Sequence, residues 1–224
     1  MKKHNFSAGP CILPQQVLEK ASQAILNFNN SSLSLIEISH RSKDFVAVMD
    51  KAQALVKELL QVPKSYSVLF LQGGASTQFL MTSMNLLKTS GKAAYINTGT
   101  WSTKAIKEAK RYGDIDVIAS SEDKNFSYIP KEYSYSENTD YLHFTSNNTI
   151  FGTQFHEFPK VSKDTMLVCD MSSDIFSRKI DVSKFDLIYA GAQKNMGPAG
   201  TTLVIIKDET LNKTGRDIPT MLNY

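Results

Sequence analysis

Glycine and polar residues follow several short apolar runs of this 224-residue chain, where they could form a binding site. Gly73-Gly74-Ala75-Ser76 follows one run, Trp101 a second, Asp170 a third and Lys194 a fourth. Glycines ahead of a helix let backbone N–H groups close around an anion, and the helix dipole helps. A lysine amine can act as a nucleophile, a carboxylate can pair with a cation, and an indole can stack on a flat ring.

Each of these features also has a simpler structural explanation. The glycine stretch could be a tight turn, and its spacing fits neither a Walker loop nor the Gly-x-Gly-x-x-Gly fingerprint. Asp170 could be a capping or turn residue, Lys194 a solvated surface lysine, and Trp101, the only tryptophan, a packing residue. Taken singly, these explanations are stronger, so a functional site is indicated only if the four features converge.

Short apolar runs alternate with amphipathic segments along most of the chain. Strands are predicted at Ser67–Leu71, Ala93–Asn97, Tyr141–Thr145, Met166–Cys169, Leu187–Ala190 and Thr202–Lys207. Helices are predicted from Pro14 to Phe28, from a cap at Asp44 to Leu59 and a stop at Pro63, over Thr77–Lys88 and over Trp101–Tyr112. The polar stretch Ser120–Asp140 is predicted to be a loop with at most one irregular strand.

This alternation is typical of an α/β protein, with a mostly parallel sheet and helices on both of its faces. In such sheets, ligands bind beyond the carboxyl ends of the strands, where the loops converge. The glycine stretch, Trp101, Asp170 and Lys194 would all lie at that rim. A phosphate cradle, a flat aromatic ring, a carboxylate and a lysine are what pyridoxal 5′-phosphate requires. A partly dry site would also lower the pKa of the lysine amine.

Composition and charge argue against several other classes of protein. The chain is 42% hydrophobic, and its 25 basic against 22 acidic residues give a net charge of only +3. That balance does not favour nucleic acid or a membrane surface as a partner. The two cysteines, Cys11 and Cys169, have no metal-ligand spacing and do not suggest a disulfide scaffold. With no apolar stretch behind Met1, a cytoplasmic protein without a metal is expected.

Four blocks of the sequence resemble those of the phosphoserine aminotransferases, a family of fold-type I pyridoxal-phosphate enzymes. They are Asn5–Pro10 (NFSAGP), Glu37–Phe45 (EISHRSKDF), Asp170–Arg178 (DMSSDIFSR) and Gly191–Gly200 (GAQKNMGPAG). The resemblance runs from residue 5 to the last residue, and the fourth block is highly specific. It implies the large domain of a fold-type I transferase.

The resemblance also implies a role for each polar residue of the predicted rim. Lys194 would be the Schiff-base lysine. Asp170 would pair with the pyridine nitrogen, and Trp101 would stack on the ring. Thr149 would hydrogen-bond the cofactor.

Phosphate and substrate contacts follow from the same resemblance. Gln193 and the backbone N–H groups of Ala75 and Ser76 would bind the cofactor phosphate. Some relatives have an arginine in place of Ser76, so one phosphate-binding charge would be missing here. Arg41 would bind a substrate carboxylate through its two-pronged guanidinium, and His40 beside it would be structural.

The implied activity transfers an amino group from L-glutamate to 3-phosphohydroxypyruvate, giving O-phospho-L-serine and 2-oxoglutarate in serine biosynthesis. Bacterial relatives also use a related phosphorylated keto acid in pyridoxine biosynthesis, and the family forms homodimers. A desulfurase on the same fold is a weaker alternative, because it would place a histidine, not Gln193, before Lys194.

The resemblance also gives a domain organisation. Residues 1–30 would associate with a small domain, and residues 31–224 would form the large cofactor-binding domain. Family members continue past Tyr224 into a C-terminal small domain, so this chain is expected to lack it. A remnant that binds cofactor without efficient turnover is therefore a second hypothesis.

Overall fold

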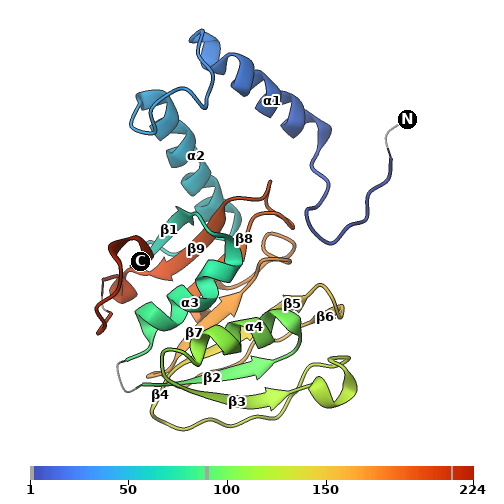
Figure 1. Ribbon diagram of the computed structural model, residues 1–224, viewed down its shortest axis with the longest axis vertical. Helices are drawn as coiled ribbons and strands as arrows, with labels where there is room; N and C mark the ends of the chain where they lie inside the picture. The colour runs from blue at the N-terminus through green and yellow to red at the C-terminus, as the bar shows by residue number, and fades with distance from the viewer. Residues whose placement is uncertain (1–2, 89–90, 213) are drawn as a thin grey trace.

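A seven-stranded sheet forms the centre of the computed structural model, which describes residues 3–88, 91–212 and 214–224 (Figure 1). In sheet order the strands are β1 (Tyr66–Leu71), β9 (Thr202–Lys207), β8 (Leu187–Gly191), β7 (Met166–Asp170), β4 (Thr139–Thr145), β2 (Lys92–Asn97) and β3 (Asp114–Ser120). β9 runs antiparallel to β1 and β8, and the pairs from β8 to β3 are parallel. The mostly parallel sheet is therefore confirmed.

The six predicted strands are all present, with ends that differ by at most two residues. The edge strand β3 is not among the predictions, because Asp114 and Asp116 interrupt its apolar residues. It pairs only with β2 among the described strands, so those carboxylates are left at the surface. A short hairpin follows β4, in which the two-residue strands β5 (Asn147–Asn148) and β6 (Thr153–Gln154) pair antiparallel.

Four α-helices match the predicted helical segments. They are α1 (Gln15–Leu26), α2 (Lys43–Leu59), α3 (Gly74–Leu86) and α4 (Thr100–Ala109). The predicted cap of α2 is wrong, because Ser42 has the extended backbone of a cap and its hydroxyl accepts a hydrogen bond from the Phe45 N–H at 3.3 Å. Asp44 lies inside the first turn, where its charge favours the helix dipole.

Both faces of the sheet are covered, as the alternation of side chains along each strand requires. On one face, Phe79 of α3 and Ile106 of α4 pack against a layer that includes Tyr141 and Val204. The other face contributes large apolar residues such as Phe144, which pack with residues from the C-terminal end of α2 and from irregular segments of the chain. Helices therefore lie on both faces, and α2 has much less of its length in contact than α3.

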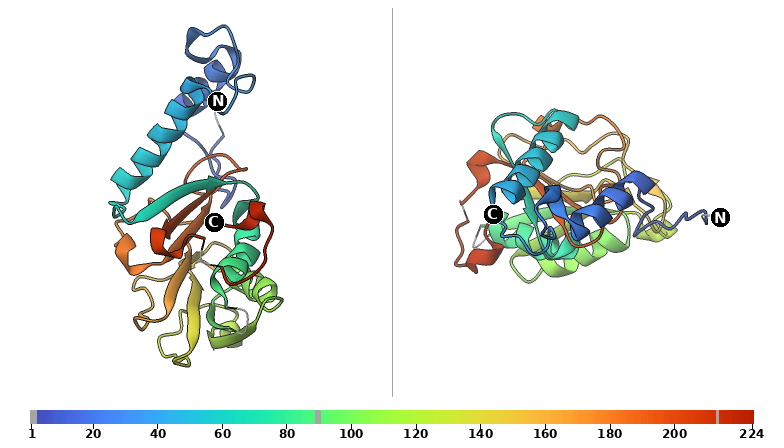
Figure 2. Two further views of the ribbon diagram at one scale, coloured as in Figure 1. Left: turned by 90° about the vertical axis from the view of Figure 1, so that its left-hand side faces the viewer. Right: turned by 90° about the horizontal axis from the view of Figure 1, so that it is seen from above.

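The N-terminal part of the chain stands away from the sheet. Figures 1 and 2 show α1 and the beginning of α2 projecting from one end of the molecule. No residue of α1 is buried, and Phe6, Leu26 and Ile36 are 93%, 71% and 79% exposed. The division at residue 30 into a separate N-terminal segment stays a prediction. None of the described helices is long and apolar enough to cross a membrane.

Candidate active site

The predicted rim of the sheet holds a cavity of about 120 Å³, and most of the predicted site residues line it. Each of these residues lies at or just after the carboxyl end of a strand, or at the start of the helix that follows it. The lining residues are Gly74, Ala75, Ser76, Phe79, Trp101, Thr145, Asn147, Asp170, Ser172, Ser173, Gln193 and Lys194. The predicted convergence of the glycine stretch, the indole, the acid and the lysine is therefore found in the fold.

Lys194 reaches across this cavity from the loop after β8. Its Nζ donates a hydrogen bond to Thr149 Oγ1 at 2.6 Å and lies 5.0 Å from the centre of the Trp101 ring. Burial lowers the pKa of Lys194, while the negative charge of Asp170 opposes that shift. The amine is thus easier to deprotonate than that of a surface lysine, and it lies over the indole face where a flat ligand would stack.

Asp170 is the last residue of β7 and is 4% exposed. Its Oδ1 accepts two hydrogen bonds from Ser172, from the backbone N–H at 3.0 Å and from the hydroxyl at 2.6 Å. Burial raises the pKa of Asp170, and the Ser172 bonds and the charge of Lys194 oppose the rise. Because Ser172 occupies one carboxylate oxygen, the other can pair with a cationic N–H of a ligand.

The glycine stretch forms the beginning of α3. The helix starts at Gly74, three residues before the prediction, so Ala75 and Ser76 lie in its first turn, where backbone N–H groups have no partner inside the helix. Gly73 has φ +94°, and a Cβ there would collide with the Thr77 side chain. The chain therefore needs glycine to turn from β1 into a helix whose N-terminus can bind an anion.

Thr149 does not line the cavity, but it lies beside it in the turn between β5 and β6. This hairpin is attached to the loop after β7 by Ser173, whose hydroxyl donates to the Asn147 carbonyl at 2.7 Å and accepts from the Asn147 side chain at 2.9 Å. Asp174 in the same loop accepts hydrogen bonds from Ser146 and from Gln154. These hydrogen bonds connect the hairpin that carries Thr149 to the loop that follows Asp170.

Arg41 is not brought to the cavity. It precedes α2, whose N-terminal end lies away from the sheet, and its backbone N–H donates to Ser39 Oγ (Figure 1). A different N-terminal residue reaches the site: a Cβ on Gly9 would lie 3.1 Å from Cγ of Lys194. The Cys11 N–H also donates to the Gln193 carbonyl at 2.9 Å, which fixes this segment beside the lysine.

Several lining residues were outside the predicted set, notably Thr145, Asn147, Ser172 and Ser173. Ser172 had a usable signal, because a serine two residues after an aspartate can bond its carboxylate in a turn. Thr145 ends a predicted strand, and only its pairing partner places it in the site. Asn147 and Ser173 come together through the fold of the hairpin.

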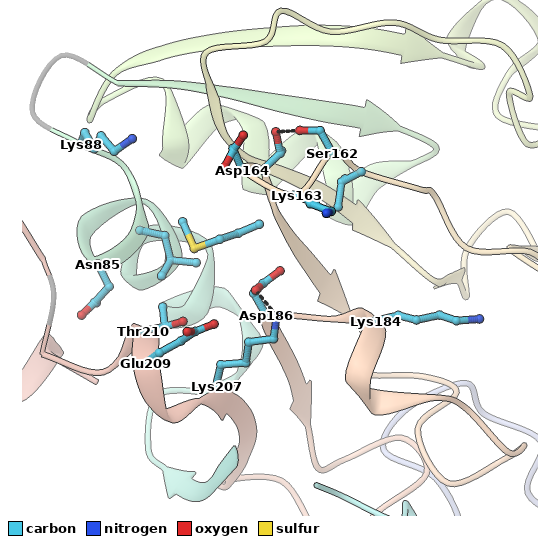
Figure 3. Close-up of a pocket in the computed structure, with 14 residues that line it drawn as sticks. Asn85, Lys88, Ser162, Lys163, Asp164, Lys184, Asp186, Lys207, Glu209 and Thr210 are labelled. Atoms are coloured by element: carbon cyan, nitrogen blue, oxygen red, sulfur yellow. Dashed lines mark hydrogen bonds and ion pairs between the residues drawn. The ribbon is translucent and has the colours of Figure 1, made fainter. Parts of the chain in front are cut away.

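A larger hollow of about 470 Å³ lies at the amino ends of the parallel strands β7 and β8, opposite the predicted site (Figure 3). Its Asp186 precedes β8, binds Lys207 Nζ at 2.7 Å and accepts from the Leu167 N–H at 2.7 Å. The charges of Asp186 and Lys207 are thus paired with each other, away from the carboxyl ends of the parallel strands. Within residues 3–88, 91–212 and 214–224, no group of three His, Cys, Asp or Glu side chains is placed to hold a metal ion.

Taken together, the sheet order and the residues at its rim define the large domain of a fold-type I pyridoxal-phosphate transferase. Residues 3–218 match the family described as aminotransferase class-V, and the chain belongs to that family.

Named relatives and solved structures agree with this assignment. The phosphoserine aminotransferase of Flavobacterium johnsoniae is 66% identical over 225 residues, which cover 100% of this chain and 63% of the relative. The solved phosphoserine aminotransferase of Bacillus circulans subsp. alkalophilus gives a TM-score of 0.94 at 48% identity, covering 98% of this chain and 61% of that one. The pyridoxal-phosphate-bound phosphoserine aminotransferase of Trichomonas vaginalis gives a TM-score of 0.92 at 36% identity, covering 100% of this chain and 63% of that one. The chain thus spans less than two thirds of the length of each of these three proteins.

Proposed function

We propose that this chain is the cofactor-binding part of a phosphoserine aminotransferase, which moves an amino group from L-glutamate to 3-phosphohydroxypyruvate and yields O-phospho-L-serine and 2-oxoglutarate. The observation that carries the proposal is the meeting of Lys194, Asp170 and Trp101 around one cavity at the carboxyl ends of the strands. The names of the similar proteins support the choice of substrates.

The groups around the cavity fit pyridoxal 5′-phosphate. Asp170 has an oxygen available for the pyridine nitrogen, Trp101 offers a face for the ring, and the first turn of α3 together with Gln193 offers donors for the phosphate. Lys194 supplies the amine that bonds the cofactor. The bound cofactor would draw electrons from the α-carbon of the amino acid and carry the amino group between the two substrates.

Lys194 would also move the proton that leaves the α-carbon. Its lowered pKa gives a larger share of neutral amine, which would accept that proton at Nζ. The resulting ammonium would return the proton to the cofactor or to the second substrate. Thr149 orients the amine through its 2.6 Å hydrogen bond. Asp170, held by Ser172, keeps its negative charge on the ring side of the cavity when a cation pairs with it.

Arg41 would bind a substrate carboxylate, but within one chain it lies away from the cavity. Its helix begins away from the cavity, and the N-terminal part of the chain exposes Phe6, Leu26 and Ile36 to solvent. Large exposed apolar residues are typical of a surface that another subunit covers. We therefore infer a homodimer in which that surface is buried.

Serine biosynthesis would be the pathway, with a phosphorylated keto acid of pyridoxine biosynthesis as a further substrate. A cytoplasmic location is supported by the two cysteines, which are both free thiols. The second candidate function is cofactor binding without efficient turnover by the 224-residue chain alone. The position of Arg41 outside the cavity favours that candidate.

A coupled assay separates the two candidates. The chain is loaded with pyridoxal 5′-phosphate and given glutamate and 3-phosphohydroxypyruvate, and 2-oxoglutarate release is followed through glutamate dehydrogenase. Release that depends on the phosphorylated keto acid supports the aminotransferase. A stable cofactor band without release supports the binding-only candidate, and failure to bind the cofactor contradicts both.

A further inference from the structure

Thr145, the last residue of β4, has a buried hydroxyl that makes no hydrogen bond with any described residue. The residue is only 3% exposed. A buried hydroxyl without a partner is unfavourable, and valine would fill almost the same volume without that cost. The hydroxyl is therefore expected to find a partner that the folded chain does not supply.

The register of the sheet places this hydroxyl in the active-site cavity. Thr145 and Asp170 are partners in the parallel pairing of β4 with β7, so their side chains lie on the same face. Both residues line the cavity with Trp101 and Lys194. Thr145 thus belongs to the site by position, although none of the roles discussed above uses it.

The polar residue one step deeper on the same face has a partner of its own. His143, two positions earlier on β4, has Nε2 2.8 Å from the Tyr189 hydroxyl and stacks on Tyr95 with 4.7 Å between the ring centres. Next to Thr145, Oδ1 of Asp170 is already taken by Ser172. Nδ1 of His143 also lacks a partner among the described residues, but His143 does not line the cavity, so of these two residues only Thr145 presents its unpartnered group at the cavity.

We infer that Thr145 is a further cofactor-binding residue, whose hydroxyl hydrogen-bonds the edge of the bound pyridine ring beside Asp170. This inference rests on the cofactor binding proposed above. It assigns the unpartnered hydroxyl to the cofactor. The hydroxyl therefore lowers the stability of the cofactor-free chain and strengthens cofactor binding.

The test compares Thr145→Val, which removes the hydroxyl and keeps the shape, with Thr145→Ser, which keeps the hydroxyl. Thr202→Val is the matched control, because Thr202 is 0% exposed and its hydroxyl also lacks a partner among the described residues, but it does not line the cavity. Cofactor affinity is measured by quenching of the fluorescence of Trp101, the only tryptophan. Urea unfolding of the cofactor-free chain is measured in parallel.

Thr145→Val is expected to weaken pyridoxal 5′-phosphate binding roughly three- to tenfold, the effect of one lost hydrogen bond. It should leave the cofactor-free chain as stable as the wild type or more stable. Thr145→Ser should bind within about twofold of the wild type, as should Thr202→Val.

Two results would overturn the inference while the proposed function stands: unchanged affinity in Thr145→Val, or a loss of cofactor-free stability that shows a partner within the fold. Failure of the wild-type chain itself to bind the cofactor is a separate result. It contradicts the proposed function and the inference together.

Discussion

The amine of Lys194 and the hydroxyl of Thr149 are 2.6 Å apart, although 45 positions separate them in the sequence. One residue comes from the loop after β8 and the other from the β5–β6 turn, so their contact depends on the packing of β4, β7 and β8 side by side. The hydroxyl accepts from the ammonium and thereby favours its charged form, against the burial that lowers its pKa. Lys194 is therefore held in one place with an amine that readily releases its proton.

Lys194→Ala is expected to abolish the absorbance band near the visible edge that a covalently bound pyridoxal 5′-phosphate gives. Alanine has no amine with which to bond the cofactor aldehyde. The spectrum is recorded after dialysis and without borohydride, because reduction of the imine would remove the band in every variant. Lys104→Ala is the control, since Lys104 Nζ lies 4.8 Å from the same Trp101 ring but Lys104 does not line the cavity. A band that survives in Lys194→Ala shows that another group bonds the cofactor.

Thr149→Val is expected to lower the pKa of Lys194 further. A hydrogen bond to a charged group contributes about 1.5 kcal/mol or more, so losing the bond to the Thr149 hydroxyl should favour the neutral amine. Because the amine must be neutral to react, covalent cofactor binding should set in at a lower pH. Its midpoint is measured by titrating the absorbance band, with Thr149→Ser as the control that keeps the hydroxyl. A midpoint at equal or higher pH contradicts the assignment.

Asp170→Asn should have opposite effects on the free and loaded chains. Burial raises the pKa of Asp170, so the stability linked to this group is present below its unfolded pKa and is lost as pH rises through its folded pKa. Asparagine removes that cost, and we expect the cofactor-free chain to gain about 1 kcal/mol at pH 7. Cofactor affinity should fall, because the amide brings no charge to the ring nitrogen.

Urea unfolding with and without pyridoxal 5′-phosphate measures both effects of Asp170→Asn. Asp174→Asn is a contrast, because it weakens the contacts of Asp174 with Arg178 and Gln154 and should destabilise both forms. If Asp170→Asn destabilises the free chain as well, Asp170 is a structural residue first.

His143 should make the fold sensitive to acid. Burial lowers its pKa to about 3, against 6.5 for an ordinary histidine. Between these values the unfolded chain binds a proton that the folded chain does not, so stability falls as pH decreases, by about 2 kcal/mol from neutral pH to pH 5.

Stability is measured by urea unfolding at a series of pH values from 7 to 5. His143→Gln should flatten this part of the curve, whereas substitution of the exposed His156 by Gln should leave it unchanged. An unaltered slope in His143→Gln would mean that other groups cause the acid sensitivity.

Much of the fold could be predicted from the sequence because buried parallel strands are continuous apolar runs. Each run indicated where a strand ends, and therefore which residues lie at the rim: Asp170 at the end of β7 and Lys194 after β8. The edge strand β3 lacks such a run and could not be recognised. The cap of α2 needed backbone conformation, which distinguishes Ser42 from Asp44.

The sequence by itself thus determined the α/β class, the strand ends and the chemistry of the rim, since these depend on local patterns of burial and on residue types. Only the tertiary structure decided which polar groups meet: Thr149 with Lys194, and Thr145 in register with Asp170. It also placed Arg41 away from the cavity. These outcomes depend on the order and pairing of strands distant in sequence, and a shift of one residue in register would turn each side chain to the other face.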